Sequence, residues 1–408
     1  EIYIPDRKKE GYGPSIKSFE ELIKKNVKTI FTVDCGTLSF EAISYAKKNN
    51  IDVIVLDHHQ SEIKLPVAYS IINPNRLDDK SNLQYLCAAG VTFMFLVSLN
   101  RELRTINWFE ENNIKEPNLM NFLDLVSLGT ICDVVPLIGL NRALVKQGLK
   151  ILKSKKNLGL KTLLDICKIE STPSIYHLGF MLGPRINAGG RVGKCSHGAN
   201  LLLNSDPKDA FKLASELDQF NKERQMLEKD LLLKLLNETK NYSKDPVLVL
   251  SGSNWHEGII GIVAARLKDK FNKPVIIISI EGQIGKASAR SINGFDIGSV
   301  IIAATQGKIL LKGGGHKMAG GFSINIKNIE KFKEFVFKKF RSVNEDITSE
   351  KPIYLDSTLS PAAINLDFYN KVNYLAPFGS GNPEPKFLIE NLKTLNGKIV
   401  GEKHIKSV

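Results

Sequence analysis

Five acidic and imidazole side chains in the first third of the chain have the types and spacing of ligands for divalent cations. They lie at the ends of strand-like segments or in an irregular segment: Asp34, Asp57, His58, His59 and Asp133. Mixed carboxylate and imidazole ligands suit Mn²⁺ and, with fewer histidines, Mg²⁺. Two such ions about 3.5 to 4 Å apart would bind a phosphoryl oxygen, generate hydroxide and stabilise a leaving oxygen. The pattern therefore predicts hydrolysis of a phosphate ester or anhydride.

Each of these residues also has a purely structural interpretation. A lone aspartate at the end of a strand is commonly a helix cap or a turn residue, so Asp34 alone would indicate little. The adjacent histidines are harder to explain by packing, because a strand directs His58 and His59 to opposite sides. The histidine pair is therefore the stronger indication of a metal site.

The cysteines do not form a zinc or a disulfide pattern. Their number is odd and no two have Cys-x-x-Cys spacing: Cys35, Cys87, Cys132, Cys167 and Cys195. Cys35 and Cys132 adjoin candidate metal ligands, yet small buried filler is the expected role for both. We expect reduced thiols.

Alternating strand and helix patterns would position the candidate ligands. Residues 29–34 and 52–57 read as strands, the second with an aliphatic run typical of a buried parallel strand, and residues 39–50 between them read as an amphipathic helix. Parallel strands joined by a helix end at the same edge of a sheet, so Asp34 and Asp57 should converge. The fold class predicted for this part is α/β with a parallel sheet.

The rest of the chain predicts further modules. A helix over about 118–128 should end near Gly129, before an irregular segment that holds Asp133. Ser205 or Asp206 could cap a long helix that begins at Pro207 and spans roughly 45 Å. A second α/β pattern follows from residue 245 to about 342, then a polar linker over 341–351 and a β-rich segment over 352–408.

The length and the charge of the chain limit the number of domains and the classes of partner that it can have. A chain of 408 residues predicts two or three domains. Its formal net charge of +13 suits a polyanionic partner such as nucleic acid, although a basic proteome would explain it equally well. No apolar run is long enough to span a bilayer, and the N-terminal residues lack the apolar stretch of a signal peptide. We therefore expect a cytoplasmic protein.

Ten segments resemble, in the same order, motifs of the DHH phosphoesterase superfamily, and specifically its branch of single-stranded-DNA-specific exonucleases. The resemblance covers essentially the whole chain and rests on YIPDRKKEGYGPS, FTVDCGTLSF, VLDHHQ, SIINPN, LGTICDVVPL, GPRINAGGR, SNWHEGIIGIVAARL, SARS, GGGHKMAGG and APFGSGNPEP. It implies a DHH domain over 1–204, a connecting long helix over 205–242, a DHH-associated substrate-binding domain over 243–342 and the start of an OB-fold over 352–408.

The resemblance also implies an activity and a set of residues for it. The activity is digestion of single-stranded DNA from the 5′ end to mononucleotides, in DNA repair and recombination, with Mn²⁺ or Mg²⁺. Asp34, His58 and Asp133 would bind the metals, His59 would face the scissile phosphate, and Asp57 would orient the histidines. One departure is Cys35, where many relatives have asparagine.

Implied partners are single-stranded DNA and, as candidates, a single-strand-binding protein or a RecQ-type helicase, with the chain a monomer. The implied substrate-binding residues are Arg185, Asn187, Arg191, Trp255, His256, Ser288, Arg290, Gly314, Gly315 and His316. Arginine forks and glycine amides suit phosphate oxygens, and Trp255 could stack on a base. The alternatives are salt-bridged arginines, a glycine-rich turn without a ligand and a core tryptophan.

Two other functions compete with the exonuclease. One is a DHH phosphoesterase for small substrates such as short oligonucleotides or cyclic dinucleotides, whose members generally end after two domains, so residues from Pro352 onward favour the nuclease. The other is a replication or repair scaffold that has lost its metals. Clustered ionisable groups at a sheet edge argue against the scaffold.

The resemblance further implies an Asp-x-Asp motif on an opening strand, a few tens of residues before the segment at 3–15, which the given sequence does not include. We therefore expect weak metal binding and little nuclease activity from these 408 residues alone. Adding the upstream strand should restore both, as measured by Mn²⁺ titration and by release of nucleotides from single-stranded DNA. Full activity without that strand would contradict the assignment of the ligands.

Overall fold

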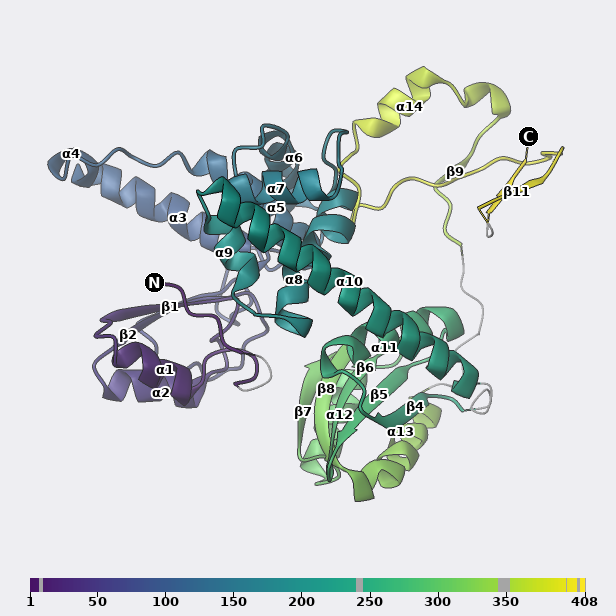
Figure 1. Ribbon diagram of the computed structural model, residues 1–408, viewed down its shortest axis with the longest axis horizontal. Coiled ribbons are helices and arrows are strands. Elements are labelled where there is room, and N and C mark those ends of the chain that lie inside the picture. Colours follow the sequence, from purple (N-terminus) through teal and green to yellow (C-terminus); the bar gives the residue numbers. More distant parts are fainter. Residues whose placement is uncertain (7–9, 240–244, 344–352, 394, 402–403, 408) are drawn as a thin grey trace. The chain divides into compact units, whose positions relative to one another are not determined.

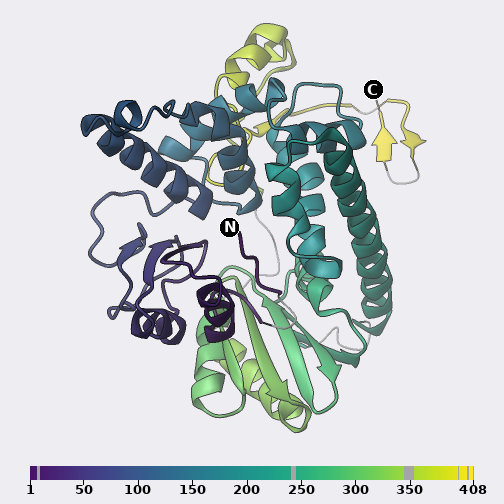
Figure 2. The same ribbon diagram turned by 60° about the vertical axis from the view of Figure 1, so that its left-hand side comes forward.

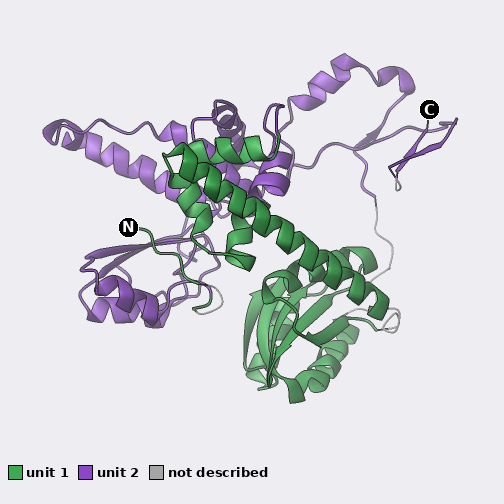
Figure 3. Ribbon diagram, viewed as in Figure 1, with its two compact units in different colours: residues 1–11, 158–168, 184–351 green, residues 12–157, 169–183, 352–408 purple. Residues whose placement is uncertain are grey.

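The chain forms two compact units, shown in Figure 3. In this computed structural model the described residues are 1–6, 10–239, 245–343, 353–393, 395–401 and 404–407. Unit 1 comprises residues 1–11, 158–168 and 184–351, and unit 2 comprises residues 12–157, 169–183 and 352–408. Residues 240–242 of the expected connecting helix and 344–351 of the expected linker lie outside the described residues. None of the described helices is both long and apolar enough to cross a lipid bilayer.

Unit 2 contains the predicted parallel sheet with a connecting helix. The order is β1-β2-β3, and the elements are α1 (Ile16–Ile23), β1 (Thr29–Val33), α2 (Phe40–Lys48), β2 (Asp52–Leu56) and β3 (Ser70–Ile72). Ile43 of α2 and Val55 of β2 are fully buried in the core between helix and sheet. Val33 pairs with Leu56. The strands therefore end together, and the next residue of each, Asp34 and Asp57, emerges at one edge.

A group of helices follows the sheet in unit 2 (Figure 1). They are α3 (Ala88–Thr105), α4 (Trp108–Glu111), η1 (Leu119–Phe122), α5 (Leu123–Cys132), α6 (Gly139–Lys153) and the π-helical η2 (His177–Leu182). The expectation that a helix ends near Gly129 is wrong, because α5 continues through it to Cys132. A Cβ atom at Gly129 would lie 2.7 Å from Ala89 Cβ of α3. The glycine allows two helices to approach closely and does not terminate one.

The C-terminal part of unit 2 contains short strand pairs and an unpredicted helix. The elements are β9 (Ser357–Thr358), η5 (Pro361–Ala363), α14 (Leu366–Asn373), β10 (Phe387–Leu388), β11 (Lys398–Val400) and β12 (His404–Lys406). β9 pairs with β10 in parallel, and β11 with β12 antiparallel. The Asn365 side chain caps α14 by accepting from Phe368 N–H at 2.9 Å, which is the local signal that starts the helix.

Unit 1 begins with helices that pack along one long helix (Figure 2). They are α7 (Leu158–Ile166), α8 (Gly183–Val192), α9 (His197–Leu203) and α10 (Pro207–Glu238, 32 residues). As the sequence predicts, α10 starts with proline in its first turn and Asp206 as its cap, which accepts from the N–H groups of Lys208 and Asp209 at 2.9 Å. Leu217 and Leu231 are buried on its inner face.

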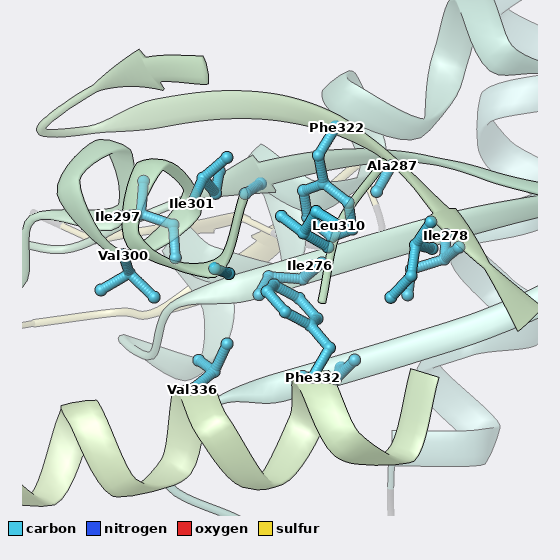
Figure 4. Close-up of a cluster of buried hydrophobic side chains, with 14 of the residues drawn as sticks. Ile276, Ile278, Ala287, Ile297, Val300, Ile301, Leu310, Phe322, Phe332 and Val336 are labelled. Atoms are coloured by element: carbon cyan, nitrogen blue, oxygen red, sulfur yellow. The ribbon is translucent and has the colours of Figure 1, made fainter. Parts of the chain in front are cut away.

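The second α/β layer structure lies in unit 1. Its five-stranded sheet has the order β4-β5-β6-β8-β7. The elements are β4 (Leu248–Ser253), α11 (Glu257–Phe271), β5 (Val275–Glu281), β6 (Ile284–Arg290), α12 (Ile297–Gln306), β7 (Lys312–His316), β8 (Ala319–Asn325), η4 (Ile326–Asn328) and α13 (Ile329–Val343). Leu231 of α10 and Val263 of α11 pack with Ile277 on one sheet face. On the other face Phe332 of α13 packs against Ile276 (Figure 4).

The crossing of α5 and α6 gives a test of the packing that places Asp133. A Cβ atom at Gly148 of α6 would lie 1.9 Å from Ser127 Oγ and 2.0 Å from Leu123 O. Gly148→Ala should therefore force the helices apart and lower the free energy of unfolding by about 1–3 kcal/mol. Gly190 of α8 has no atom within 4 Å of its missing Cβ, so Gly190→Ala should raise that free energy by about 0.5–1 kcal/mol. Urea unfolding measures both, and equal effects of the two variants would contradict the packing.

Candidate functional site

The structure brings four of the candidate metal ligands together in unit 2. One ligand atom each from Asp34, His58 and His59 lies within 4.8 Å of the others. His58 Nε2 is 3.2 Å from Asp34 Oδ1 and 3.5 Å from Asp133 Oδ2. The side chains come from the ends of β1, β2 and α5. This open group of two carboxylates and two imidazoles is a ligand set that suits Mn²⁺ or Mg²⁺. It lacks the thiolates and the closed geometry of a structural zinc site.

Asp34 follows β1 in a left-handed backbone conformation, with φ of 62°. Aspartate adopts this conformation more readily than most residues. Its N–H still donates to Leu56 O at 3.0 Å, and its carbonyl accepts from the Tyr12 hydroxyl. The Tyr12 ring also meets His59 edge-on, with centroids 5.9 Å apart. The chain therefore turns sharply at the end of β1 while both backbone groups of Asp34 remain bonded.

Asp57 lies behind the two histidines and is 1% exposed. Its Oδ1 accepts from the N–H groups of His58 and His59 at 2.8 and 3.2 Å and lies 2.7 Å from His59 Nδ1. Its Oδ2 accepts from Thr37 N–H at 3.1 Å. Burial would raise the pKa of Asp57, but the hydrogen bonds from His59 and Thr37 outweigh it and hold that pKa well below its usual range. Asp57 thus has the contacts of a carboxylate that orients both histidines.

Two asparagines that the sequence reasoning missed support the histidines from the end of β3. Asn73, which is buried, donates to His59 O and to Thr37 Oγ1, both at 2.8 Å. Asn75 donates to His58 O at 2.6 Å. The available signal was their position in SIINPN, at the carboxyl end of a third strand. The parallel pairing of β2 with β3 places the carboxyl end of β3 at the sheet edge that carries Asp34 and Asp57, and the sequence alone does not show this pairing.

The charges around the site act on one another. For His58, burial lowers the pKa, but the hydrogen bond to Asp34 and the charge of Asp133 outweigh it and leave that pKa raised. The hydrogen bond to Asp57 raises the pKa of His59. Burial, together with the charge of Asp34, raises the pKa of Asp133. A bound divalent cation would oppose these shifts by favouring neutral His58 and ionised Asp133.

Cys35 lies beside this group but does not have the character of a ligand. Burial, with the charges of Asp57 and Asp34, raises the pKa of its thiol to about 12. Its Sγ lies 3.4 Å from Val33 O, where the thiol donates. Since a metal binds the thiolate, the neutral Cys35 thiol is not a ligand. The expectation of buried filler is wrong for both cysteines, because Cys35 is only partly buried and Cys132 is exposed.

Three of the expected substrate-binding residues lie on α8, and two of them make internal contacts. Arg185 Nε donates to Asp218 Oδ1 at 2.8 Å, and Arg191 Nη1 donates to Gly258 O at 2.6 Å. Asn187 is exposed. The alternative of a salt-bridged arginine therefore describes Arg185 in this structure. DNA would have to bind through guanidinium N–H groups other than those of Arg185 Nε and Arg191 Nη1, or replace these contacts.

Ser288 and Arg290 lie together on β6. Arg290 Nη1 donates to Ser288 Oγ at 3.1 Å and to Ala289 O at 2.8 Å. Burial lowers the pKa of Arg290. A Cβ atom at Gly261 of α11 would lie 2.9 Å from Arg290 Nη2, so the glycine makes room for the guanidinium. A half-buried guanidinium beside a hydroxyl is a suitable group for a phosphate.

The glycine-rich segment is a β-hairpin that turns at Lys317 and Met318, so it contains the turn that the sequence offers as an alternative, and its glycines lie in the paired strands. Gly314 and Gly315 lie in β7, opposite Gly321 and Gly320 of β8. A Cβ atom at Gly315 would lie 2.5 Å from Gly320 Cα, so glycine is required for the close approach of the strands. His316 ends β7 and is exposed.

Of the two roles that the sequence leaves open for Trp255, the structure supports the core role and not stacking on a base. Trp255 is 8% exposed and belongs to the core between α10, α11 and the sheet. Its neighbour His256 caps α11, with Nδ1 accepting from Gly258 N–H at 3.0 Å. Both residues therefore fix the start of α11.

Comparisons with known proteins agree with the fold. The DHH family N-terminal domain matches residues 1–130, the DHHA1 domain matches 244–342, and the RecJ OB domain matches 355–408. The class of protein is therefore a DHH-family protein with a DHHA1 domain. The chain is 35% identical to the single-stranded-DNA-specific exonuclease RecJ of Escherichia coli, over 99% of its own length and 71% of that protein. The chain belongs to the RecJ family.

Solved structures show the same relationship. The crystal structure of Thermus thermophilus RecJ in complex with Mn²⁺ matches with a TM-score of 0.83 and 29% identity, over 97% of this chain and 56% of that one. The Mg²⁺ complex from the same organism matches with a TM-score of 0.73 and 29% identity, over 93% of this chain and 54% of that one. The chain thus spans little more than half the length of these solved relatives.

Replacing Asp57 tests its orienting contacts. Asp57→Asn would put an amide N–H₂ against either Thr37 N–H or the histidine N–H groups, so it should lower the free energy of unfolding by about 1–3 kcal/mol and weaken Mn²⁺ binding about 10-fold. Asp52→Asn is the matched control, because Asp52 is exposed at the other end of β2. Urea unfolding and Mn²⁺ titration give the two quantities. Equal behaviour of the two variants would contradict the role.

The Asp57–His59 pair should also make stability depend on pH. The lowered pKa of Asp57 adds stability above its unfolded value of about 3.9, which is lost as the pH falls through the folded pKa. The raised pKa of His59 adds stability below its unfolded value of about 6.5, which is lost as the pH rises through the folded pKa. The difference in unfolding free energy between the wild type and Asp57→Asn should therefore be largest between about pH 4 and 6.5. A difference that is constant from pH 3 to 9 would contradict the linkage.

Proposed function

We propose that this chain is the nuclease part of a metal-dependent exonuclease that degrades single-stranded DNA from the 5′ end to mononucleotides, in DNA repair and recombination. The observation that carries the proposal is the convergence of Asp34, His58, His59 and Asp133 at one sheet edge, in a chain of the RecJ family. A hydrolase needs such a group, whereas a metal-free scaffold has no use for it.

Asp34, His58 and Asp133 would hold the metal, with Mn²⁺ or Mg²⁺ as the candidates. Bound there, the cation supplies positive charge at the scissile phosphate and lowers the pKa of the attacking water. The carboxylates of Asp34 and Asp133 are substantially exposed, so they can accept a cation from solvent. A metal on His58 requires Nε2 without its proton, which makes binding weaker at acidic pH.

His59 would act on the phosphate. Its Nδ1 is held by Asp57 Oδ1 at 2.7 Å, which leaves Nε2 as the nitrogen that can meet the substrate. The raised pKa of His59 favours the imidazolium, which carries a proton on Nε2. We assign it to donate that proton to a phosphoryl or leaving oxygen. Asp57 keeps the ring in place for this step.

Phosphate groups of the DNA would be held by residues of the DHHA1 domain. Ser288 and Arg290 offer a hydroxyl and a guanidinium on β6. Gly314, Gly315 and the exposed His316 are further candidates on β7, an edge strand whose alternate N–H groups point away from β8. Arg185, Asn187, Arg191 and His256 stay candidates that need a change of contacts or a direct test. The net charge of +13 predicts binding that weakens with salt.

The setting of the activity follows from the same proposal. We infer a monomeric, cytoplasmic enzyme that acts on single strands delivered by a single-strand-binding protein or a RecQ-type helicase. The competing small-substrate phosphoesterase would prefer a dinucleotide to a long strand, so the substrate preference separates the two.

The proposal is tested with a long single strand, the matching duplex and a dinucleotide, each carrying a label at either end, incubated with this protein and with Mn²⁺, Mg²⁺ or EDTA. The expected result is mononucleotide release from the 5′ end of the single strand, lost in EDTA and lowered by about 10²–10⁴-fold in His59→Ala. Asp34→Ala should abolish activity, and Asp52→Asn should leave it unchanged. Preference for the dinucleotide, or activity that survives Asp34→Ala, would contradict the proposal.

A further inference from the structure

The residues that follow Asp133 are held from two sides within unit 2. Leu137 N–H donates to Ser380 O at 2.7 Å, which joins them to residues 376–382, here called the C-terminal loop. From the other side the buried Asn141 side chain donates to Pro136 O at 2.9 Å and to Tyr85 O at 2.6 Å. These hydrogen bonds therefore restrain the backbone of the segment between α5 and α6.

Glycines in the C-terminal loop allow this contact to be close. A Cβ atom at Gly379 would lie 2.7 Å from Leu137 Cδ1, and one at Gly381 would lie 2.9 Å from Pro136 Cβ. Gly381 also has a φ of +70°. The loop is closed by paired backbone bonds between Gly379 and Asn382, at 2.8 and 3.1 Å. The C-terminal loop therefore packs closely against Pro136 and Leu137.

Arg142 of α6 holds the other end of the same loop. Its Nη2 donates to the carbonyl oxygens of Tyr374, Leu375 and Ala376 at 3.2, 2.8 and 3.3 Å. These carbonyls lie at the C-terminal end of α14, where they have no partner within the helix and attract a cation. Arg142 therefore bonds α6 directly to the residues that lead into the C-terminal loop.

The backbone at Val134 shows why such support is needed. Asp133 caps α5, and Val134 follows in the left-handed conformation with φ of +59°. This position after a helix normally holds glycine or asparagine, because a β-branched side chain is strained there. Val134 is 68% exposed, so burial of its side chain does not offset the strain.

Space beside this contact would allow the strain to relax. A largely apolar cavity of about 940 Å³ is lined by Val134, Leu137, Phe180, Phe378 and Gly379, among others. The chain at Val134 therefore keeps its conformation because of its bonded neighbours and not because of dense packing on every side.

We propose that Arg142 and the C-terminal loop are positioning elements for Asp133. They hold Val134 in its strained conformation, and that conformation keeps the Asp133 carboxylate facing His58 Nε2 at 3.5 Å. The proposal rests on the metal site of the proposed function and deepens it, because it makes metal affinity depend on a segment that contributes no ligand.

The test compares Mn²⁺ affinity, measured from the EPR signal of unbound Mn²⁺, with affinity for a fluorescent oligothymidylate in the absence of divalent metal. Arg142→Ala and Gly379→Ala should each weaken Mn²⁺ binding about 10-fold and leave DNA affinity unchanged. Arg101→Ala and Gly397→Ala are the matched controls, since Arg101 is exposed on α3 and the missing Cβ of Gly397 has only an ordinary contact at 3.7 Å. Both controls should bind Mn²⁺ like the wild type.

A second substitution separates positioning from general loss of structure. Val134→Asn should restore most of the Mn²⁺ affinity of Arg142→Ala, because asparagine adopts the left-handed conformation with little strain. Wild-type Mn²⁺ affinity in both Arg142→Ala and Gly379→Ala, or a failure of Val134→Asn to restore it, would overturn the proposal. Asp133→Ala serves as the reference. If Asp133→Ala binds Mn²⁺ like the wild type, the proposed metal site is wrong. If Asp133→Ala weakens Mn²⁺ binding but Arg142→Ala and Gly379→Ala do not, only the positioning role is refuted.

Discussion

The hydrogen bonds to the buried Asp57 carboxylate are the interaction on which the site depends. One oxygen accepts two consecutive backbone N–H groups and holds His59 Nδ1, and the other accepts Thr37 N–H from the turn after β1. A buried charge is costly unless its partners compensate for the lost water, and here they outweigh that cost, since the pKa of Asp57 is lowered. The same bonds join the ends of β1 and β2, so the sheet edge and the imidazoles are fixed together.

Other parts of unit 2 add to this arrangement from greater distances along the chain. Asn73 and Asn75 hold the histidine carbonyls from the third strand. Asp133 arrives at the end of a helix that lies close to α3 at Gly129 and to α6 at Gly148. Glycines therefore serve in unit 2 where helices cross, and in unit 1 where β7 and β8 approach. Their role in both units is to remove a side chain and not to form a turn.

Local patterns in the sequence predicted several of the elements but not their contacts. The strand–helix–strand pattern predicts β1, α2 and β2, and with parallel register it places Asp34 beside Asp57. Asp206 and Pro207 predict the start of α10. By contrast, Gly129 reads as a helix end because its partner Ala89 is far away in the sequence. The glycines around His316 indicate a turn, which the hairpin has, but they do not show which strands pair, because strand pairing is not a local property.

The same limit explains the other differences at the site. Trp255 could be assigned to the core only when α10 was seen to pack against α11, and the salt bridge of Arg185 depends on a neighbouring helix. Arg142 carries no motif of its own, since its partners are backbone carbonyls of a distant segment. Asp34, His58, His59 and Asp133 could be named from the sequence because few structural needs place two histidines after a buried strand; their role as ligands stays a proposal.

Metal binding by Asp34, His58 and Asp133 is tested most directly by anomalous diffraction at the manganese edge, from crystals of this protein grown with Mn²⁺. We expect an anomalous peak within bonding distance of Asp34, His58 and Asp133, and we expect that peak to be lost in crystals of Asp34→Ala. A peak elsewhere, or one that persists without the Asp34 carboxylate, would contradict the proposed metal site.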